Sequence, residues 1–215
     1  SFNFKIMKIK IFFLIFVFAV NFLSFSNAEI KNSILVKVGN EIITSLDLRN
    51  EILTNLIVNK IDVNQENIDA SKNLAIKNLI NKKIKRIEIT KYQITDYNKN
   101  DLQKYLTNIS NLFETNSSGL KKLFETNNID YDAFVYNYET ELLWNTLIFR
   151  IYSNQTNINI IEVENELEKI KNDKADLDPE EIKKQIINTK KQEKLNLFSR
   201  SHFSNLENST NIEFK

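Results

Sequence analysis

Ile34-Leu-Val-Lys-Val-Gly-Asn-Glu-Ile-Ile-Thr-Ser-Leu-Asp-Leu48 is the stretch of sequence that decides the fold. Two β-prone runs, 34–38 and 41–44, flank Gly39-Asn40, and both loop residues tolerate the positive φ of tight two-residue turns. An isolated two-stranded ribbon is only marginally stable, so this hairpin requires a partner from elsewhere in the chain. The residues expected on its buried face are Ile34, Val36, Val38 and Ile43.

The chain that follows has a helical pattern. Thr44 or Ser45 can cap the first helix, and Asp47 in its first turn favours the helix dipole. With only 2 Gly and 1 Pro in the sequence, the helices should be long. Apolar spacing predicts helices over about 45–60, 67–91, 96–113, 118–125, 131–152, 160–170 and 179–206.

The C-terminus ends on a β-prone run, Ile212–Phe214, which has nothing local to pair with. We expect it to dock antiparallel on the hairpin and to complete a three-stranded sheet. The predicted fold class is therefore mainly α, with a small β-hairpin or three-stranded sheet closed by the C-terminal strand.

Two helices carry faces that need an interpretation. The helix over 131–152 is apolar around most of its circumference, which is typical either of a helix central to a core or of one that exposes a binding surface. The helix over 67–91 has a basic side, which we interpret as a solvated face. That side comprises Lys77, Lys82, Lys85 and Arg86.

The first residues have the pattern of a secretory signal peptide. Lys8 and Lys10 precede the apolar run 11–23, and Ser26-Asn27-Ala28 supplies a small-x-small cleavage site. The run is short of the ~20 residues that span a bilayer. We therefore expect residues 1–28 to be an upstream extension and signal peptide, cleaved after Ala28 on export; an uncleaved membrane anchor is the alternative.

The amino-acid composition limits which partners, cofactors and catalytic groups this chain can use. The net charge is +1, which gives no support to a nucleic-acid partner, and there is no cysteine. His202 is the sole histidine, so a histidine-rich metal site and a Cys/His pair are excluded. There is also no glycine-rich phosphate loop for a nucleotide. We predict a protein that is not an enzyme and that uses no metal, nucleotide or other cofactor.

The order of these elements resembles the SurA-type periplasmic chaperones. The resemblance rests on the hairpin followed by Thr44-Ser-x-Asp-Leu48, the Leu79-Ile-x-x-x-Ile84 run, the cap at Thr95-Asp96, a short helix and a long aromatic one. It covers about 34–170, and the last helix and strand are similar to the SurA C-terminal segment. It implies an N-terminal chaperone domain over 29–173 and a C-terminal segment, 174–215, that packs back on it. No parvulin isomerase module fits between them.

The resemblance also implies a function. It is that of an ATP-independent periplasmic chaperone, a holdase that binds unfolded envelope or outer-membrane proteins. The alternatives are a foldase related to peptidyl-prolyl cis/trans isomerases and a membrane-anchored scaffolding protein. Aromatic side chains suit a surface that grips apolar peptides, and we expect them in a cleft against the helix over 179–206. The candidate peptide-binding residues are Phe113, Phe124, Phe134, Tyr138 and Trp144.

Overall fold

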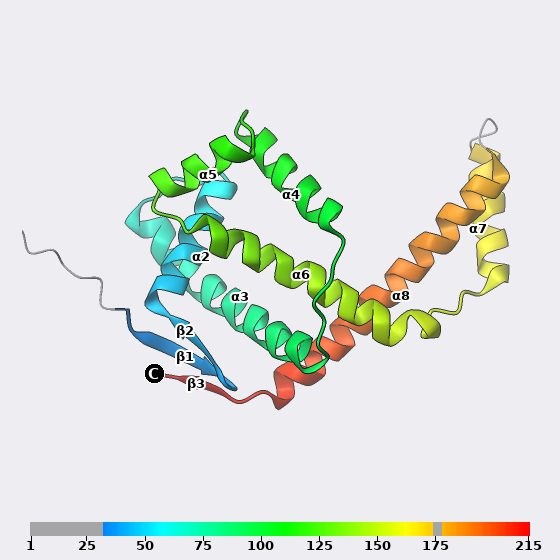
Figure 1. Cartoon of the computed structure of the whole chain (residues 1–215). Coiled ribbons are helices and arrows are strands. Elements are labelled where there is room, and N and C mark those ends of the chain that lie inside the picture. Colours follow the sequence, from blue (N-terminus) through cyan, green and yellow to red (C-terminus); the bar gives the residue numbers. More distant parts are fainter. Residues whose placement is uncertain (1–31, 174–177) are drawn as a thin grey trace, which may run out of the picture. The chain divides into compact units, whose positions relative to one another are not determined.

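The computed structural model describes residues 32–173 and 178–215, and in them the chain is mainly helical with a small antiparallel sheet (Figure 1). The predicted fold class is confirmed. The signal-peptide prediction for 1–28 lies outside the described residues. The elements are β1 (Ile34–Val38), β2 (Glu41–Thr44), α2 (Ser45–Val58), α3 (Gln65–Lys91), α4 (Lys99–Leu112), α5 (Ser117–Thr126), α6 (Tyr131–Tyr152), the 3₁₀ turn η1 (Ser153–Gln155), α7 (Ile160–Asp173), α8 (Pro179–Ser209) and β3 (Ile212–Phe214).

The sheet has the strand order β2-β1-β3, so the last strand lies beside the first (Figure 1). Gly39 takes the positive φ, +56°, that the tight turn between β1 and β2 requires. β3 pairs antiparallel with β1, with Val36 opposite Phe214 and Val38 opposite Ile212. The predicted docking of the C-terminal tail is confirmed.

The buried face of the hairpin is nearly the predicted one. Val36, Val38 and Ile43 have no exposed surface and pack on α3. Ile34, expected beside them, is 49% exposed, because the β1–β2 register shifts between Ile34 and Val36. The ring of Phe214 is also largely outside the core, with 68% of the residue exposed.

Side-chain caps set where the helices begin. Thr44 and Asp47 form a reciprocal capping box at the start of α2, in which Thr44 N–H donates to the Asp47 carboxylate at 2.8 Å. α4 begins at Lys99 rather than at about 96, because the Asn98 side chain accepts from the Asn100 N–H and caps the helix there. The remaining predicted helices end within a few residues of the observed ones.

α6 is the central helix of the fold. It packs on α3, α4, α5 and α8 (Figure 1). Its first turns join an aromatic cluster with α2, α4 and α5, and its second half joins a cluster with the ends of α3 and α8. The buried α6 side chains are Phe134, Thr140, Leu142, Leu143, Trp144, Leu147 and Ile148. The core interpretation of this apolar helix therefore holds for most of its surface.

α7 and the first half of α8 form a helical hairpin with a core of its own. Val163 and Leu167 of α7 pack on Ile182 and Ile186 of α8, and all four are buried. Lys183 pairs with Glu164 and Lys190 with Glu166 across the same interface. No helix among residues 32–173 and 178–215 has the length and apolar character needed to span a membrane.

Candidate functional site: a cleft between α2, α3, α4 and α6

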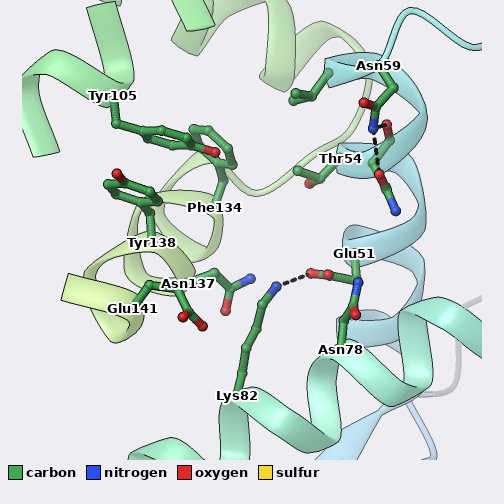
Figure 2. Close-up of a pocket in the computed structure, with 12 residues that line it drawn as sticks. Glu51, Thr54, Asn59, Asn78, Lys82, Tyr105, Phe134, Asn137, Tyr138 and Glu141 are labelled. Atoms are coloured by element: carbon green, nitrogen blue, oxygen red, sulfur yellow. Dashed lines mark hydrogen bonds and ion pairs between the residues drawn. The ribbon is translucent and has the colours of Figure 1, made fainter. Parts of the chain in front are cut away.

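A cleft with one aromatic side and one polar side opens between α2, α3, α4 and α6 (Figure 2). Its volume is about 260 Å³, just under the roughly 300–1,000 Å³ of sites that enclose a whole small ligand. It can therefore hold a few side chains of a longer ligand. The lining residues are Glu51, Thr54, Asn55 and Val58 of α2, Asn59 just after it, Asn78 and Lys82 of α3, Tyr105 of α4, and Phe134, Asn137, Tyr138 and Glu141 of α6.

Helical spacing puts each set of side chains on one face. On α6 the lining residues fall at positions i, i+3, i+4 and i+7 from Phe134 to Glu141, and on α2 they repeat the same spacing from Glu51 to Val58. Residues at these offsets lie above one another along a helix. Two helices thus present matching stripes toward the same space.

The aromatic side is built around a tyrosine pair. The rings of Tyr105 and Tyr138 stack with centroids 3.5 Å apart and an interplanar angle of 5°, and Phe134 lies beside Tyr105 at 5.8 Å (Figure 2). Burial raises the pKa of both the Tyr105 and the Tyr138 phenol above the usual 10.0. Both hydroxyls therefore stay protonated at neutral pH and can donate hydrogen bonds.

The polar side is held by an ion pair and an amide pair. Lys82 Nζ lies 2.7 Å from Glu51 Oε2, and the Glu51 carboxylate is almost fully buried (Figure 2). Asn59 Nδ2 donates to Asn55 Oδ1 at 2.6 Å. The Thr54 hydroxyl is buried and has no hydrogen-bond partner among the described residues. These contacts fix the side chains in place and leave amide groups of the cleft able to bind backbone N–H and C=O groups.

The five predicted peptide-binding residues do not lie together. Phe134 and Tyr138 line the cleft. Phe124 is fully buried and packs edge-on to Phe134, 4.8 Å between centroids, and Phe113 packs at the margin of the same cluster. Trp144 lies in a different cluster, where its indole N–H donates to Ser199 of α8 at 2.8 Å.

A second cavity lies at the predicted contact between the helical body and α8. It measures about 310 Å³ and is lined by α6 side chains such as Phe149 and by α8 side chains such as Leu195. None of the five aromatic candidates lines it. The aromatic candidates and the expected α8 cleft are therefore separate places in this fold.

Sequence reasoning missed the partners of Tyr138. Tyr105 was not a candidate, and Lys82 was assigned to a solvated face. That interpretation of the basic side holds for the exposed Lys77 and was wrong for the other three residues. Lys82 pairs with Glu51, Lys85 pairs with Glu141 at 2.5 Å, and Arg86 lies 3.6 Å over the Tyr136 ring. The signal that could have found the cleft is the polar and aromatic stripe at helical spacing on the otherwise apolar helix over 131–152.

Comparison with known proteins finds a likeness in structure and none in sequence. No protein-family model matches the chain, and no curated protein matches it in sequence. A solved structure from a study of PEB4 and Cj1289, two SurA-like chaperones of Campylobacter jejuni, overlays on 86% of this chain and 99% of its own length, with 17% identity and a TM-score of 0.41.

Proposed function

We propose that this chain is an ATP-independent chaperone that holds unfolded polypeptides, and that the cleft around Tyr105 and Tyr138 contacts them. The observation that supports this proposal is that an aromatic wall and fixed amide side chains face each other in one open cleft. Tyrosine rings bind apolar side chains of any shape, and carboxamides can bond a peptide backbone whatever its sequence. Such a site recognises an extended chain rather than a particular residue.

The proposal extends to the compartment and the clients. The signal-peptide pattern of residues 1–28 supports a periplasmic location. Outer-membrane and other envelope polypeptides, which cross that compartment unfolded, are then the clients that we propose. The domain boundaries of the sequence analysis, 29–173 and 174–215, remain part of this proposal.

The binding should be weak and reversible. Without a nucleotide cycle, release must come from modest affinity, and a micromolar Kd corresponds to roughly −8 kcal/mol. The charges in the cleft are already paired, Lys82 with Glu51 and Lys85 with Glu141. Added salt should therefore change client affinity little.

The test is suppression of aggregation of a urea-denatured outer-membrane protein on dilution. Tyr138→Ser removes half of the stacked pair and should weaken suppression several-fold. Tyr92→Ser is the matched control, since Tyr92 is an accessible tyrosine at the end of α3 that does not line the cleft. Phe124→Ser is unsuitable as a binding probe, because Phe124 is fully buried and its loss destabilises the fold.

Photo-crosslinking locates the contact. A benzophenone amino acid at position 138 should crosslink to the denatured client, and the same group at position 92 should not. Wild-type protein that leaves aggregation unchanged at several-fold excess would remove the holdase proposal and favour the scaffolding alternative.

A further inference from the structure

We infer that the free edge of β3, together with the apolar groove beside it, binds an extended polypeptide as a fourth, antiparallel strand. The inference rests on the proposed function for the nature of its ligand, unfolded polypeptide, and adds a second site with a different mode of recognition. β3 is an outer strand in the order β2-β1-β3, so its free edge lies on the opposite side of the sheet from β2 (Figure 1).

The hydrogen bonds of β3 show which of its backbone groups are free. Gly39 N–H donates to Asn211 C=O, and Lys215 N–H donates to Leu35 C=O, both at 2.9 Å. Backbone groups alternate in direction along an antiparallel strand. The N–H and C=O groups of Ile212 and Phe214 therefore point away from β1, toward an edge where no further strand is found among the described residues.

The groove continues the buried face of the sheet. Ile212 and Phe214 stand opposite Val38 and Val36, so their side chains share the face that packs on α3. Ile212 and Ile76 pack against that core, while 68% of Phe214 remains exposed at its rim. The groove has a volume of about 460 Å³ and is lined by Asn73, Ile76, Lys77, Ile80, Asn81, Glu207, Ile212 and Phe214.

These two features together specify the ligand. Open backbone groups spaced two residues apart require a partner in extended conformation, as in strand addition to a sheet edge. In an antiparallel partner, the residues opposite Ile212 and Phe214 turn both their backbone groups toward β3 and their side chains into the groove. The ligand is thus a strand with apolar side chains at alternate positions, the pattern of a transmembrane β-strand.

The orientation is fixed by the same geometry. Both existing pairings in the sheet are antiparallel, and antiparallel pairing is slightly more stable per residue than parallel pairing. Lys77 and Glu207 at the margins of the groove offer one charge of each sign, so the site favours neither acidic nor basic peptides.

The test uses a fluorescent peptide of alternating valine and threonine with lysine at both ends, titrated with the full chain by anisotropy. Methylating the backbone nitrogens of the valines should weaken binding about tenfold or more, because those N–H groups face β3. Methylating the threonine nitrogens should change affinity little, since those N–H groups face solvent. Equal effects of the two methylations, or the reverse order, would overturn the inference.

Variants of the protein provide the second readout. Phe214→Ser should weaken peptide binding without lowering Tm, because the residue is mostly exposed; Phe149→Ser, at 57% exposure elsewhere on the surface, is the control. Tyr92→Ser, which alters neither the groove nor the cleft, should leave this peptide's affinity unchanged. If the chain suppresses aggregation but the two methylations do not differ as expected, this inference fails and the proposed function stands. If the methylations differ as expected but the chain does not suppress aggregation, the proposed function fails and this inference stands.

Discussion

Single residues in this fold have roles set by one or two short contacts, and Tyr97 is the sharpest case. Its hydroxyl donates to Glu139 Oε1 at 2.5 Å, joining the linker before α4 to α6. That hydrogen bond, with a smaller effect of burial, raises the pKa of Tyr97 from 10.0 to about 12. The phenol is thus protonated in the folded chain at a pH where the unfolded chain has already lost the proton.

The consequence is a loss of stability at alkaline pH. A folded-state pKa above the unfolded value contributes stability that is complete below pH 10 and disappears as pH rises toward about 12. We expect the tyrosinate absorbance to show a step near pH 12 that Tyr97→Phe removes and Tyr92→Phe leaves in place. The decline in Tm between these pH values should be smaller in Tyr97→Phe, and an equal decline in both variants contradicts the assignment.

His202 of α8 joins three helices through its two ring nitrogens. Its Nε2 lies 3.2 Å from Glu88 Oε1 of α3 and its Nδ1 lies 2.8 Å from the Tyr152 hydroxyl of α6. A carboxylate only accepts, so Nε2 carries the proton toward Glu88, and in the neutral ring Nδ1 accepts from Tyr152. Glu88 is among the most buried charged residues of the described chain.

Removing this ring should cost stability. His202→Ala leaves the buried Glu88 carboxylate with Lys91 as its remaining ion-pair partner, and we expect a loss of about 1–3 kcal/mol in the free energy of unfolding. Arg200→Ala, an exposed change on the same helix, should stay within about 0.5 kcal/mol. Urea denaturation measures both, and a His202→Ala midpoint equal to wild type would show that the bridge carries no net energy.

At the scale of elements, the α7–α8 hairpin stands out because its core is closed in itself. Its packed apolar side chains come from α7, the first half of α8 and the link before α7, with none from α2 to α6. The second half of α8 behaves differently: Ser199 bonds Trp144, and Phe203 and Leu206 pack into the clusters of α3 and α6. One helix therefore spans two units of packing.

This arrangement predicts local unfolding. Ile182→Ala should speed amide hydrogen exchange in α7 and the first half of α8 while leaving α3 and α6 protected. Trp144 fluorescence should not change, since the α8 residues beside that ring, Ser199, His202 and Phe203, all lie in the second half of the helix. Leu147→Ala, in the central core, should instead lower protection throughout. Uniform loss of protection in Ile182→Ala would mean that the hairpin unfolds only with the rest.

Elements were the part of this fold that the sequence predicted best. The Gly39 turn, the Asp130 cap and Pro179 as the first residue of α8 each have a local cause, so their boundaries can be read without tertiary information. The start of α4 was wrong by three residues because Asn98 competes with Asp96 as a cap. The third strand was predictable because the hairpin has an unpaired edge and the chain offers one remaining β-prone run.

The cleft could be predicted only in part. The stripe from Phe134 to Glu141 is visible in the sequence, but which helix faces it is decided by how α2 and α4 pack on α6. The same holds for burial. The sequence alone does not tell whether Phe124 and Trp144 lie in the core or on the surface, because their burial depends on which helices pack around them. Aromatic content alone therefore indicated a peptide-binding surface without separating its members from the core.

For the whole molecule, the remaining question of chemistry is whether the chain accelerates prolyl isomerisation. The cleft side chains are engaged with one another: Glu51 pairs with Lys82, Glu141 pairs with Lys85, and the tyrosines stack. Among the described residues, no cluster of histidine, cysteine and carboxylate side chains is arranged to hold a metal. The function proposed for this cleft is to hold a chain, whereas catalysis of isomerisation would have to lower a barrier of roughly 18–20 kcal/mol to rotation about the imide bond.

We therefore expect no catalysis of cis/trans exchange. An X–Pro peptide relaxes in tens of seconds or more without a catalyst, and adding the chain should leave that rate constant unchanged at concentrations that suppress aggregation. An authentic prolyl isomerase in the same assay is the positive control. A weak slowing would be compatible with holding the peptide in the cleft and should vanish in Tyr138→Ser. A rate that rises in proportion to protein concentration, and survives dialysis against a chelator, would instead make the chain a foldase and overturn the prediction that it is not an enzyme.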